Sequence, residues 1–357
     1  MTARVLVLGA GSAAAENLAR ALRDAEPAIV LLGANDDRFV LKHSSADARY
    51  LVPAAGAPDF VRCVAALARA ERVDLVIPTT DHHVLALSAG RRALSGRVFL
   101  PAHAAIARCR DKYALTIALR RRGLPAPLTY PVPRVDAIAR TFARFGRRRR
   151  LWCRPRTGTC ARGGAAVATA EEATRWIRLW ETMQAVPASS FTLSEYLPGR
   201  EILCQSVWQR GRLVLANTFE RVSYFGVDNI PSGVTSLSSL AKTVVEPAVV
   251  DLCRRAIRVI APAASGAFSV DVKEDGEGRP HVTEINAGRF FMAMTAFDRV
   301  LKHGIVRTYL RLALGEPVEL TDEYDTVDGY YMVRDLDVTP GIFHADEMFD
   351  GIAESPR

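Results

Sequence analysis

Two carboxylates and an amide late in the sequence could together hold a divalent cation. Segments 267–273 and 280–286 alternate in polarity or are rich in β-branched residues, and the turn between them is rich in Asp, Gly and Glu, so they predict a β-hairpin. The midpoint between Asp271 and Glu284 falls inside that turn, which places these carboxylates opposite each other. Because side chains alternate faces along a strand, Asn286 shares the face of Glu284.

This polar face has two interpretations. Neighbouring carboxylates repel each other, which raises a pKa or requires a cation. Hard oxygen ligands suit Mg²⁺, which takes its remaining ligands from water and substrate phosphates. The alternative is a solvated hairpin edge with unrelated acidic residues. Asparagine argues against this alternative, because it is depleted in strands where it has no local role. The geometry alone leaves both interpretations open.

A loop rich in glycine and small residues at 157–164 is a second candidate site. A predicted strand at 151–155 leads into it, and segment 165–168 returns from it. Glycine allows backbone N–H groups to approach a phosphate closely. Cys160 lies in this loop and could be reactive, but no basic partner is identifiable. The six cysteines are scattered without metal-binding spacing, so we expect reduced thiols.

The first hundred residues alternate strands with helices, which predicts a doubly wound parallel sheet that binds ligands at the carboxyl ends of its strands. The expected strands are 5–8, 28–32 and 73–78, and the expected helices are 13–23, 60–70 and one after Asp81. Beyond this region we expect helices at 104–109, 111–122, 171–183 and 245–260, and further strands at 191–196, 201–208, 213–219 and 329–334.

Two features of this first region resemble sites but favour plainer interpretations. Gly9-Ala10-Gly11 has part of the dinucleotide-binding pattern, yet Gly33-Ala34-Asn35 replaces the acidic residue expected at the end of the second strand. We therefore favour a tight turn over an NAD site. His82 and His83 could face the same cleft as the carboxylates, but two lone histidines are more often structural or exposed.

Several segments, in this order, resemble the motifs of the ATP-grasp family, especially its carbamoyl-phosphate-synthetase-like branch. The likeness extends over roughly residues 1–315. The segments are Asp111-Lys112-Tyr113, Gly123-Leu124-Pro125-Ala126-Pro127, Trp152-Cys153-Arg154-Pro155 with the glycine-rich loop, 194–201, and Asp271 with Glu284-Ile285-Asn286 and Arg289.

The resemblance implies a mixed α/β and α+β fold. An N-terminal doubly wound parallel-sheet domain, the pre-ATP-grasp domain, would span 1–100 and precede a two-lobed ATP-grasp domain. The first lobe, with the glycine-rich phosphate loop, would span 101–190. The second lobe, with the Mg²⁺ site, would span 191–315, and residues 316–357 would be an extension of unknown role.

The resemblance also implies ATP and Mg²⁺ as cofactors, with Mn²⁺ as an alternative metal. Asp271, Glu284 and Asn286 would bind the metal. The residues expected to bind ATP are Lys112 and Arg154 at the phosphates, Gly158 and Gly163 in the loop, and Glu195, Tyr196, Leu197 and Glu201 at the adenine and ribose.

Two arginines are the catalytic candidates. By the resemblance, Arg289 would stabilise charge on the transferred phosphoryl group or on a substrate carboxylate. Arg221 could hold a substrate carboxylate, since segments 220–226 and 231–236 contain small polar residues that could line a pocket; a surface loop is the alternative.

The implied reaction is that of an ATP-dependent carboxylate–amine ligase. Such an enzyme activates a carboxylate as an acyl phosphate, joins it to an amine and releases ADP and phosphate. One departure matters: the family usually has Lys-Pro where this chain has Arg154-Pro155, and arginine keeps the charge with a different geometry. The alternative is a catalytically reduced ATP-binding regulatory or partner protein.

Bulk properties agree with a protein that acts on small molecules. The chain has no apolar run of about 18 residues, and its start does not resemble a signal peptide, so we expect no membrane span and a cytoplasmic location. The net charge of +8 suits phosphate and carboxylate ligands. The basic run at 144–150 is interpreted as a solvated turn, because no nucleic-acid-binding module accompanies it. The expected partners are small carboxylates and amines, amino acids among them, with a homo-oligomer left open.

Overall fold

The computed structural model describes residues 2–347, apart from Gly96, Arg147, Arg149, Cys160, Pro231, Val234, 291–292 and 336–340. The candidate thiol of Cys160, two arginines of the basic run and two residues of segment 231–236 therefore lie outside the described residues. Within those residues, no helix has the length and apolar character needed to cross a membrane.

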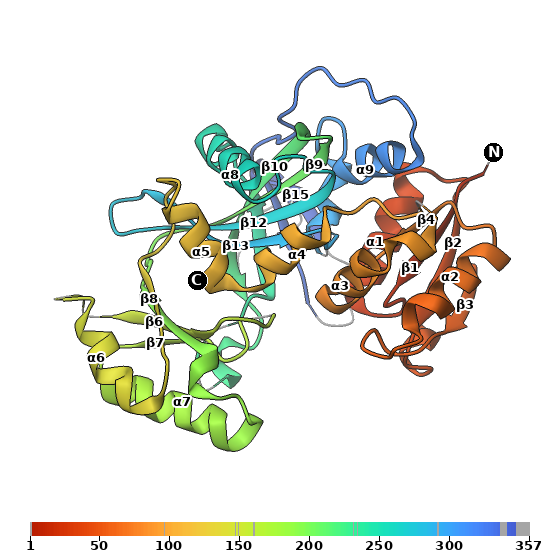
Figure 1. Ribbon diagram of the computed structural model, residues 1–357. Coiled ribbons are helices and arrows are strands. Elements are labelled where there is room, and N and C mark those ends of the chain that lie inside the picture. Colours follow the sequence, from red (N-terminus) through yellow and green to blue (C-terminus); the bar gives the residue numbers. More distant parts are fainter. Residues whose placement is uncertain are drawn as a thin grey trace, which may run out of the picture.

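The N-terminal domain is a parallel four-stranded sheet with helices on both faces (Figure 1). Val5 and Val7 face α1, whereas Leu6 and Leu8 face α2 and α3, as the alternation of strand side chains requires. The strand order is β3-β2-β1-β4. The elements are β1 (Arg4–Leu8), α1 (Ala13–Ala25), β2 (Val30–Asn35), β3 (Ala48–Leu51), α2 (Phe60–Ala70), β4 (Leu75–Ile77) and α3 (Asp81–Ala89). The predicted doubly wound sheet is confirmed.

The first lobe of the following domain is an antiparallel four-stranded sheet in the order β5-β8-β6-β7. One face is apolar: Leu151, Cys153 and Leu193 pack with Ala173 and Ile177 of helix α7. The other face carries the polar side chains of the intervening strand positions. The elements are β5 (Thr129–Pro131), α6 (Ile138–Ala143), β6 (Leu151–Pro155), β7 (Ala165–Val167), α7 (Ala170–Gln184) and β8 (Phe191–Glu195).

The second lobe is a seven-stranded sheet in the order β13-β12-β9-β10-β11-β14-β15. Its outer face is apolar, with Ile202, Val270 and Val272 packed in one core with helices α5 and α8. The elements are α4 (His103–Arg110), α5 (Lys112–Arg120), β9 (Glu201–Gln209), β10 (Arg212–Tyr224), β11 (Ser238–Thr243), α8 (Pro247–Ile260), β12 (Gly266–Glu274), β13 (Pro280–Ala287), α9 (Ile305–Leu314), β14 (Tyr330–Val333) and β15 (Gly341–His344).

The last described segment belongs to this sheet. Strand β14, which lies within the strand predicted at 329–334, pairs with β11 through Leu240 and Val333, and β15 pairs with β14. The backbone N–H of Glu246 donates to the hydroxyl oxygen of Tyr324 at 2.6 Å, which ties the loop before β14 to the start of α8.

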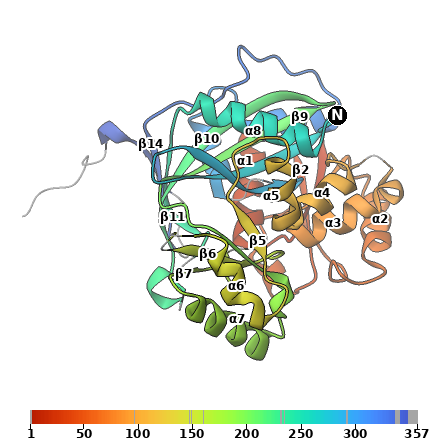
Figure 2. The ribbon, with the colours of Figure 1, turned by 60° about the vertical axis from the view of Figure 1, so that its left-hand side comes forward.

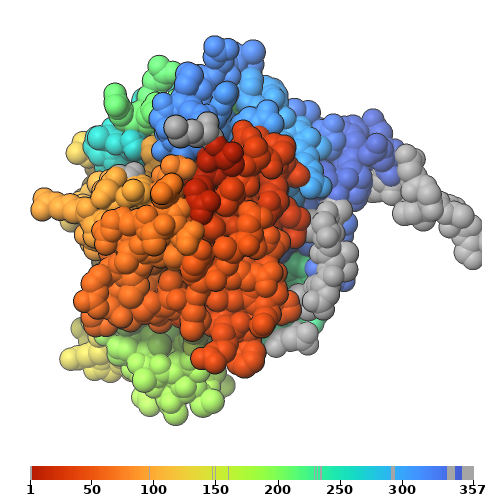
Figure 3. Space-filling model, turned by 90° about the vertical axis from the view of Figure 1, so that its right-hand side faces the viewer, coloured from red at the N-terminus to blue at the C-terminus, as the bar shows by residue number. Residues whose placement is uncertain are grey.

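The two lobes and the N-terminal domain pack against one another. Figures 1 and 2 show the two lobes facing each other, with α7 on the outside of the first lobe and α8 on the outside of the second. The N-terminal domain packs beside the second lobe, where α1 lies against α9 and the 3₁₀ helix Ala293–Arg299. Figure 3 shows this domain, in red and orange, meeting the blue C-terminal part of the chain along its upper edge.

Candidate active site

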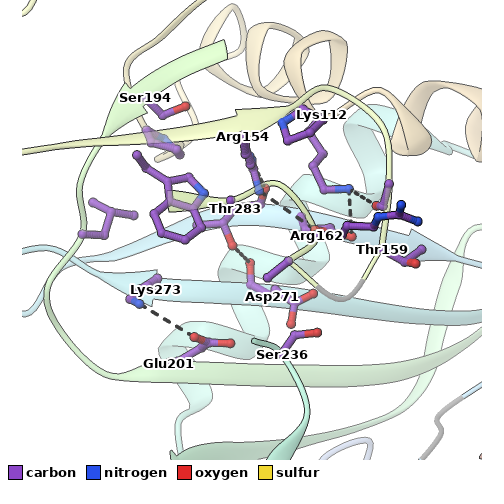
Figure 4. A pocket seen from close by; sticks show the side chains of 18 of the residues that line it. Lys112, Arg154, Thr159, Arg162, Ser194, Glu201, Ser236, Asp271, Lys273 and Thr283 are labelled. Carbon is purple, nitrogen blue, oxygen red and sulfur yellow. Dashed lines mark hydrogen bonds and ion pairs between the residues drawn. The ribbon is translucent and has the colours of Figure 1, made fainter. Parts of the chain in front are cut away.

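A cleft of about 1130 Å³, open mouth included, lies between the inner faces of the two lobes (Figure 4). Its walls come from β6, β8, β9, β10, β12 and β13, from the first residue of α5 and from the glycine-rich loop. Every site residue predicted from the sequence, apart from Gly163, lines this cleft.

The carboxylate face forms one wall. Asp271 on β12 pairs directly with Glu284 on β13, the pairing predicted from the midpoint of the turn. The amide nitrogen of Asn286 donates to Asp271 Oδ2 at 3.1 Å, and within the described residues nothing donates to the amide oxygen. Two carboxylates and an amide oxygen are therefore directed toward the same space.

The electrostatics of this wall favour a cation. Burial raises the pKa of Asp271; Arg221 opposes this rise, while the nearby carboxylates of Glu284 and Glu201 add to it. No group of three or more His, Cys, Asp and Glu side chains in the described chain could hold a metal. The donor set nevertheless suits Mg²⁺, which keeps few carboxylate ligands and completes its shell with water and phosphate oxygens.

Two cationic side chains stand next to this wall. Lys112 Nζ lies 3.4 Å from Glu284 Oε1 and donates to the carbonyl of Gly158 at 2.6 Å. Arg154 donates to the carbonyl of Thr283 at 2.9 Å, and its other terminal nitrogen lies 4.0 Å from Glu284. Burial lowers the pKa of Arg154, although Glu284 and Asp271 act in the opposite direction. Both cations thus lie beside the carboxylate of Glu284, at the edge of the carboxylate face.

Local sequence explains the position of Lys112. It is the first residue of α5, and the carboxylate of Asp111 caps that helix by accepting from the N–H groups of Tyr113 and Ala114, both at 3.0 Å. Arg156, just beyond β6, forms an ion pair with the same carboxylate. The helix start is thereby fixed to the strand that carries Arg154.

The glycine-rich loop is attached at both ends. Lys112 holds the carbonyl of Gly158, and the indole of Trp176 on α7 donates to the carbonyl of Gly163 at 3.0 Å. Gly163 has a φ of +76°, and a Cβ there would come within 2.8 Å of Pro155, so only glycine fits. Gly163 does not line the cleft; its contacts dock the loop on α7.

Known proteins resemble this chain in structure but not detectably in sequence. No family model and no curated protein matches the sequence. Solved structures do match: a biotin carboxylase from Campylobacter jejuni (TM-score 0.72, 14% identity, covering 94% of this chain and 76% of that one) and an L-amino acid ligase from Bacillus licheniformis (0.68, 12%, 89% and 75%). An N5-carboxyaminoimidazole synthetase from Staphylococcus aureus gives a TM-score of 0.68 at 11% identity, over 93% of this chain and 82% of that one.

This chain has the ATP-grasp fold. The identities are low enough that the likeness concerns the fold alone. The two lobes correspond to the two-lobed ATP-grasp domain expected from the motifs, and the parallel sheet corresponds to the domain expected before it.

The ATP-grasp cleft is also lined by Trp152, Tyr196 and Leu197. Glu195 lines the cleft as well, but the oxygens of its side chain already have partners: Oε2 accepts from the Leu128 N–H at 2.8 Å, and Oε1 lies 3.3 Å from Arg148. These contacts tie β8 to the segment before β5, through Leu128, and to the segment before β6, through Arg148. An adenine bound at Glu195, as the sequence predicts, would have to share this carboxylate with Leu128 and Arg148.

Sequence reasoning did not single out two residues that line the cleft. Trp152 lies two residues before Arg154 on β6, and Lys273 lies two residues after Asp271 on β12. The alternation of strand side chains puts each on the same face as its neighbour, so this signal was available in the sequence. Lys273 Nζ lies 3.8 Å from Glu201.

The two catalytic candidates have different surroundings. The guanidinium of Arg221 contacts Asp271 and Glu201, both protein carboxylates, although a substrate carboxylate was the predicted partner. Arg289 lines the cleft and lies 3.5 Å from Asp81, the first residue of α3. Arg289 thus connects the second lobe to the N-terminal domain.

Two features of the N-terminal domain can now be assigned. His82 lines a second hollow beside the cleft, whereas His83 stacks on Phe60 with ring centroids 5.8 Å apart. Burial lowers the pKa of His83 to about 4. The N–H of Gly11 donates to Glu16 at 2.9 Å, and a Cβ on Gly11 would overlap the Val40 carbonyl, so the Gly9–Gly11 turn is closed by the protein's own atoms.

Proposed function

We propose that this protein is an ATP-dependent ligase that activates a carboxylate as an acyl phosphate and joins it to an amine, releasing ADP and phosphate. One observation carries the proposal: Asp271, Glu284 and Asn286 meet Lys112 and Arg154 in a single cleft between two lobes. An oxygen-ligand face for Mg²⁺ beside two cations is what a polyphosphate requires.

ATP would lie along the cleft with its phosphates at Lys112, Arg154 and the glycine-rich loop. Asp271, Glu284 and Asn286 would hold Mg²⁺, which supplies charge neutralisation at the β- and γ-phosphates. The base would lie between Trp152 and Leu197, and the ribose near Glu201 and Lys273. Solved structures of the same fold hold ATP, or ADP with magnesium, which supports these ligands.

The residues would promote two steps. First, a carboxylate oxygen of the substrate attacks the γ-phosphorus, and the bond to the bridging oxygen breaks, giving an acyl phosphate and ADP. Lys112 and Arg154 would hold the transferred group, and Arg289 would neutralise charge next to it. Second, the amine nitrogen attacks the acyl carbon, phosphate leaves and the nitrogen loses a proton. The loop over the cleft would exclude water from the acyl phosphate.

A second candidate is an ATP-binding regulator that has lost turnover. The observation that favours it is that Arg154 stands where related motifs have lysine and is engaged by the Thr283 carbonyl. Arg221 also contacts the proposed metal ligand Asp271. Both candidates require ATP binding, so only turnover distinguishes them.

The deciding experiment combines product analysis with chemical trapping. The protein is incubated with ATP, Mg²⁺ and a carboxylate library in hydroxylamine, and hydroxamate, ADP and AMP are measured. ADP and hydroxamate that appear only with a carboxylate support the ligase. AMP would contradict the acyl-phosphate route, and tight ATP binding without any turnover would support the regulator.

Glu284→Gln provides the matched test of the metal face. The variant should fold and lose Mg²⁺-dependent turnover, because the amide cannot replace a charged metal ligand. Glu277→Gln is the control, since Glu277 lies in the turn of the same hairpin with a side chain 72% exposed. Equal rates for Glu284→Gln and wild type would remove the metal assignment.

A further inference from the structure

A second hollow adjoins the ATP-grasp cleft on the side of the N-terminal domain. It measures about 730 Å³, open mouth included, and shares Lys112, Glu284 and Asn286 with the cleft as a common wall. Its other walls come mainly from α3 and α4: Asp81, His82, Val84, Ile106, Cys109 and Arg110. A molecule in this hollow would therefore lie directly across the carboxylate face from the nucleotide phosphates.

An ion pair with spare bonding capacity stands where the two spaces meet. Asp81 lines the hollow, Arg289 lines the cleft, and the closest contact between them is 3.5 Å. Charge-assisted hydrogen bonds are typically about 2.7–2.9 Å long, so this contact is loose. In the described part of the chain it is the one ion pair recorded for either side chain, and both remain partly exposed, at 18% and 22%. A carboxylate and a guanidinium are thus available to a ligand at the boundary.

The remaining walls are one cation and an apolar surface. The guanidinium of Arg110 forms no hydrogen bond or ion pair with the described residues, yet it lines the hollow. Val84, Ile106 and Cys109 are buried. Burial raises the pKa of the Cys109 thiol to about 12, so the thiol is neutral and adds to the apolar surface.

These charges select the class of ligand. A dicarboxylate would bring an acidic group to Asp81, and a diamine would bring a cationic group to Arg110 and Arg289; like charges in contact are unfavourable. A small molecule with one cationic and one anionic group satisfies both ends, and an apolar side chain would meet the third wall.

We propose that the hollow binds a small apolar amino acid, with its ammonium group on Asp81 and its carboxylate beside Arg289. In this orientation the carboxylate lies at the wall shared with the phosphates, and Asp81 keeps the amino group away from the reacting centre. The assignment of this amino acid as the activated acid rests on the proposed ligase function; its binding does not.

Binding is tested first, without turnover. The protein is loaded with Mg²⁺ and a non-hydrolysable ATP analogue, and calorimetry compares valine with isovalerate and isobutylamine, which each lack one charged group. Valine should bind at least about tenfold more tightly than either, since each lost charged contact removes roughly tenfold or more in affinity. Alanine and leucine extend the series in side-chain size.

Asp81→Asn identifies the residue responsible. The variant should weaken valine binding by roughly 10- to 100-fold and leave isovalerate and the ATP analogue unaffected. Asp251→Asn, at a side chain on α8 that is 61% exposed, is the matched control and should behave as wild type. Melting temperatures of both variants verify folding.

The outcomes separate this inference from the proposed reaction. If none of these amino acids binds, if isovalerate binds as well as valine, or if Asp81→Asn changes nothing, the amino-acid site is overturned, and hydroxamate formation still decides the ligase. If valine binds through Asp81 but no carboxylate gives hydroxamate, the site stands and the ligase proposal falls.

Discussion

One nitrogen of Arg221 lies 2.7 Å from Asp271 Oδ1 and also contacts the carboxylate of Glu201. Burial opposes a charge on this guanidinium, but the two carboxylates outweigh that effect and raise the pKa of Arg221. Arg221 therefore stays positive between the proposed metal ligands and the proposed ribose end. It compensates the carboxylate that a divalent cation would otherwise neutralise.

Removal of Arg221 should make stability depend on metal. Arg221→Gln leaves the Asp271 carboxylate with the Asn286 amide but without its cationic partner, which should cost about 3–5 kcal/mol of unfolding free energy. Mg²⁺ or Mn²⁺ should recover part of this loss, and stabilise the variant more than wild type. Urea denaturation with and without the metal measures both effects.

Arg255→Gln is the control for this prediction. Arg255 pairs with Asp251 on the exposed face of α8, so its loss should change stability by no more than about 1 kcal/mol. Equal metal stabilisation of both variants would mean that the cation does not bind at Asp271.

Arg154 should be better suited to this cleft than lysine. It donates to the Thr283 carbonyl with one terminal nitrogen and extends the other toward Glu284. A lysine has a single nitrogen for both directions, so Arg154→Lys should weaken ATP binding about tenfold, and Arg154→Met more. Equilibrium binding of ATP with Mg²⁺ measures the change, with the exposed Arg175→Lys as control. Tighter binding by the lysine variant would contradict this account.

The periodicity of the sequence was enough to predict those elements whose structure depends on local pattern alone. The hairpin register that brings Asp271 opposite Glu284 follows from turn composition and alternation, and the parallel sheet follows from alternating strands and helices. Short strands without an apolar pattern, such as β5 and β11, were not predicted.

Contacts that depend on tertiary packing could not be predicted from the sequence. Strand β10 was predicted to end at Phe219 but continues to Tyr224, because its polar end pairs with β11. The meeting of Arg289 with Asp81 depends on how the N-terminal domain docks on the second lobe, and no local pattern encodes that.

Trp152 should report on the nucleotide. Its indole lines the cleft on the same strand face as Arg154. A base stacked on an aromatic ring contributes about 1–3 kcal/mol, so Trp152→Ala should weaken ATP binding correspondingly. ATP should also change the intrinsic fluorescence of wild type, and Trp152→Phe should lose most of this change. Trp180→Phe should keep it, because Trp180 lies on α7 outside the cleft lining.

Acid should destabilise the protein through His83. Burial lowers its pKa from 6.5 to about 4; Asp36 opposes the shift and His82 adds to it. Between these values the unfolded chain binds a proton that the folded chain does not, so stability falls as pH falls. From pH 6.5 to pH 5 the loss should be about 2 kcal/mol.

Denaturant titrations at several pH values measure this slope. His83→Gln cannot take up the proton, and should show a shallower decline over the same interval. His43→Gln, at an exposed histidine, should decline as wild type does. Parallel curves for His83→Gln and wild type would contradict a buried neutral histidine.

The pairing of β14 with β11 has a consequence for shortened versions of the chain. β11 lies between β10 and β14, and Met332 of β14 is fully buried against the sheet. A chain ending at Gly315 would present the unpaired N–H and C=O groups of β11 to solvent, together with the apolar surface that Met332 covers. Open strand edges of this kind pair with other copies and promote aggregation. The last strands therefore cover the edge of the sheet that carries Asp271 and keep β11 from pairing with other copies.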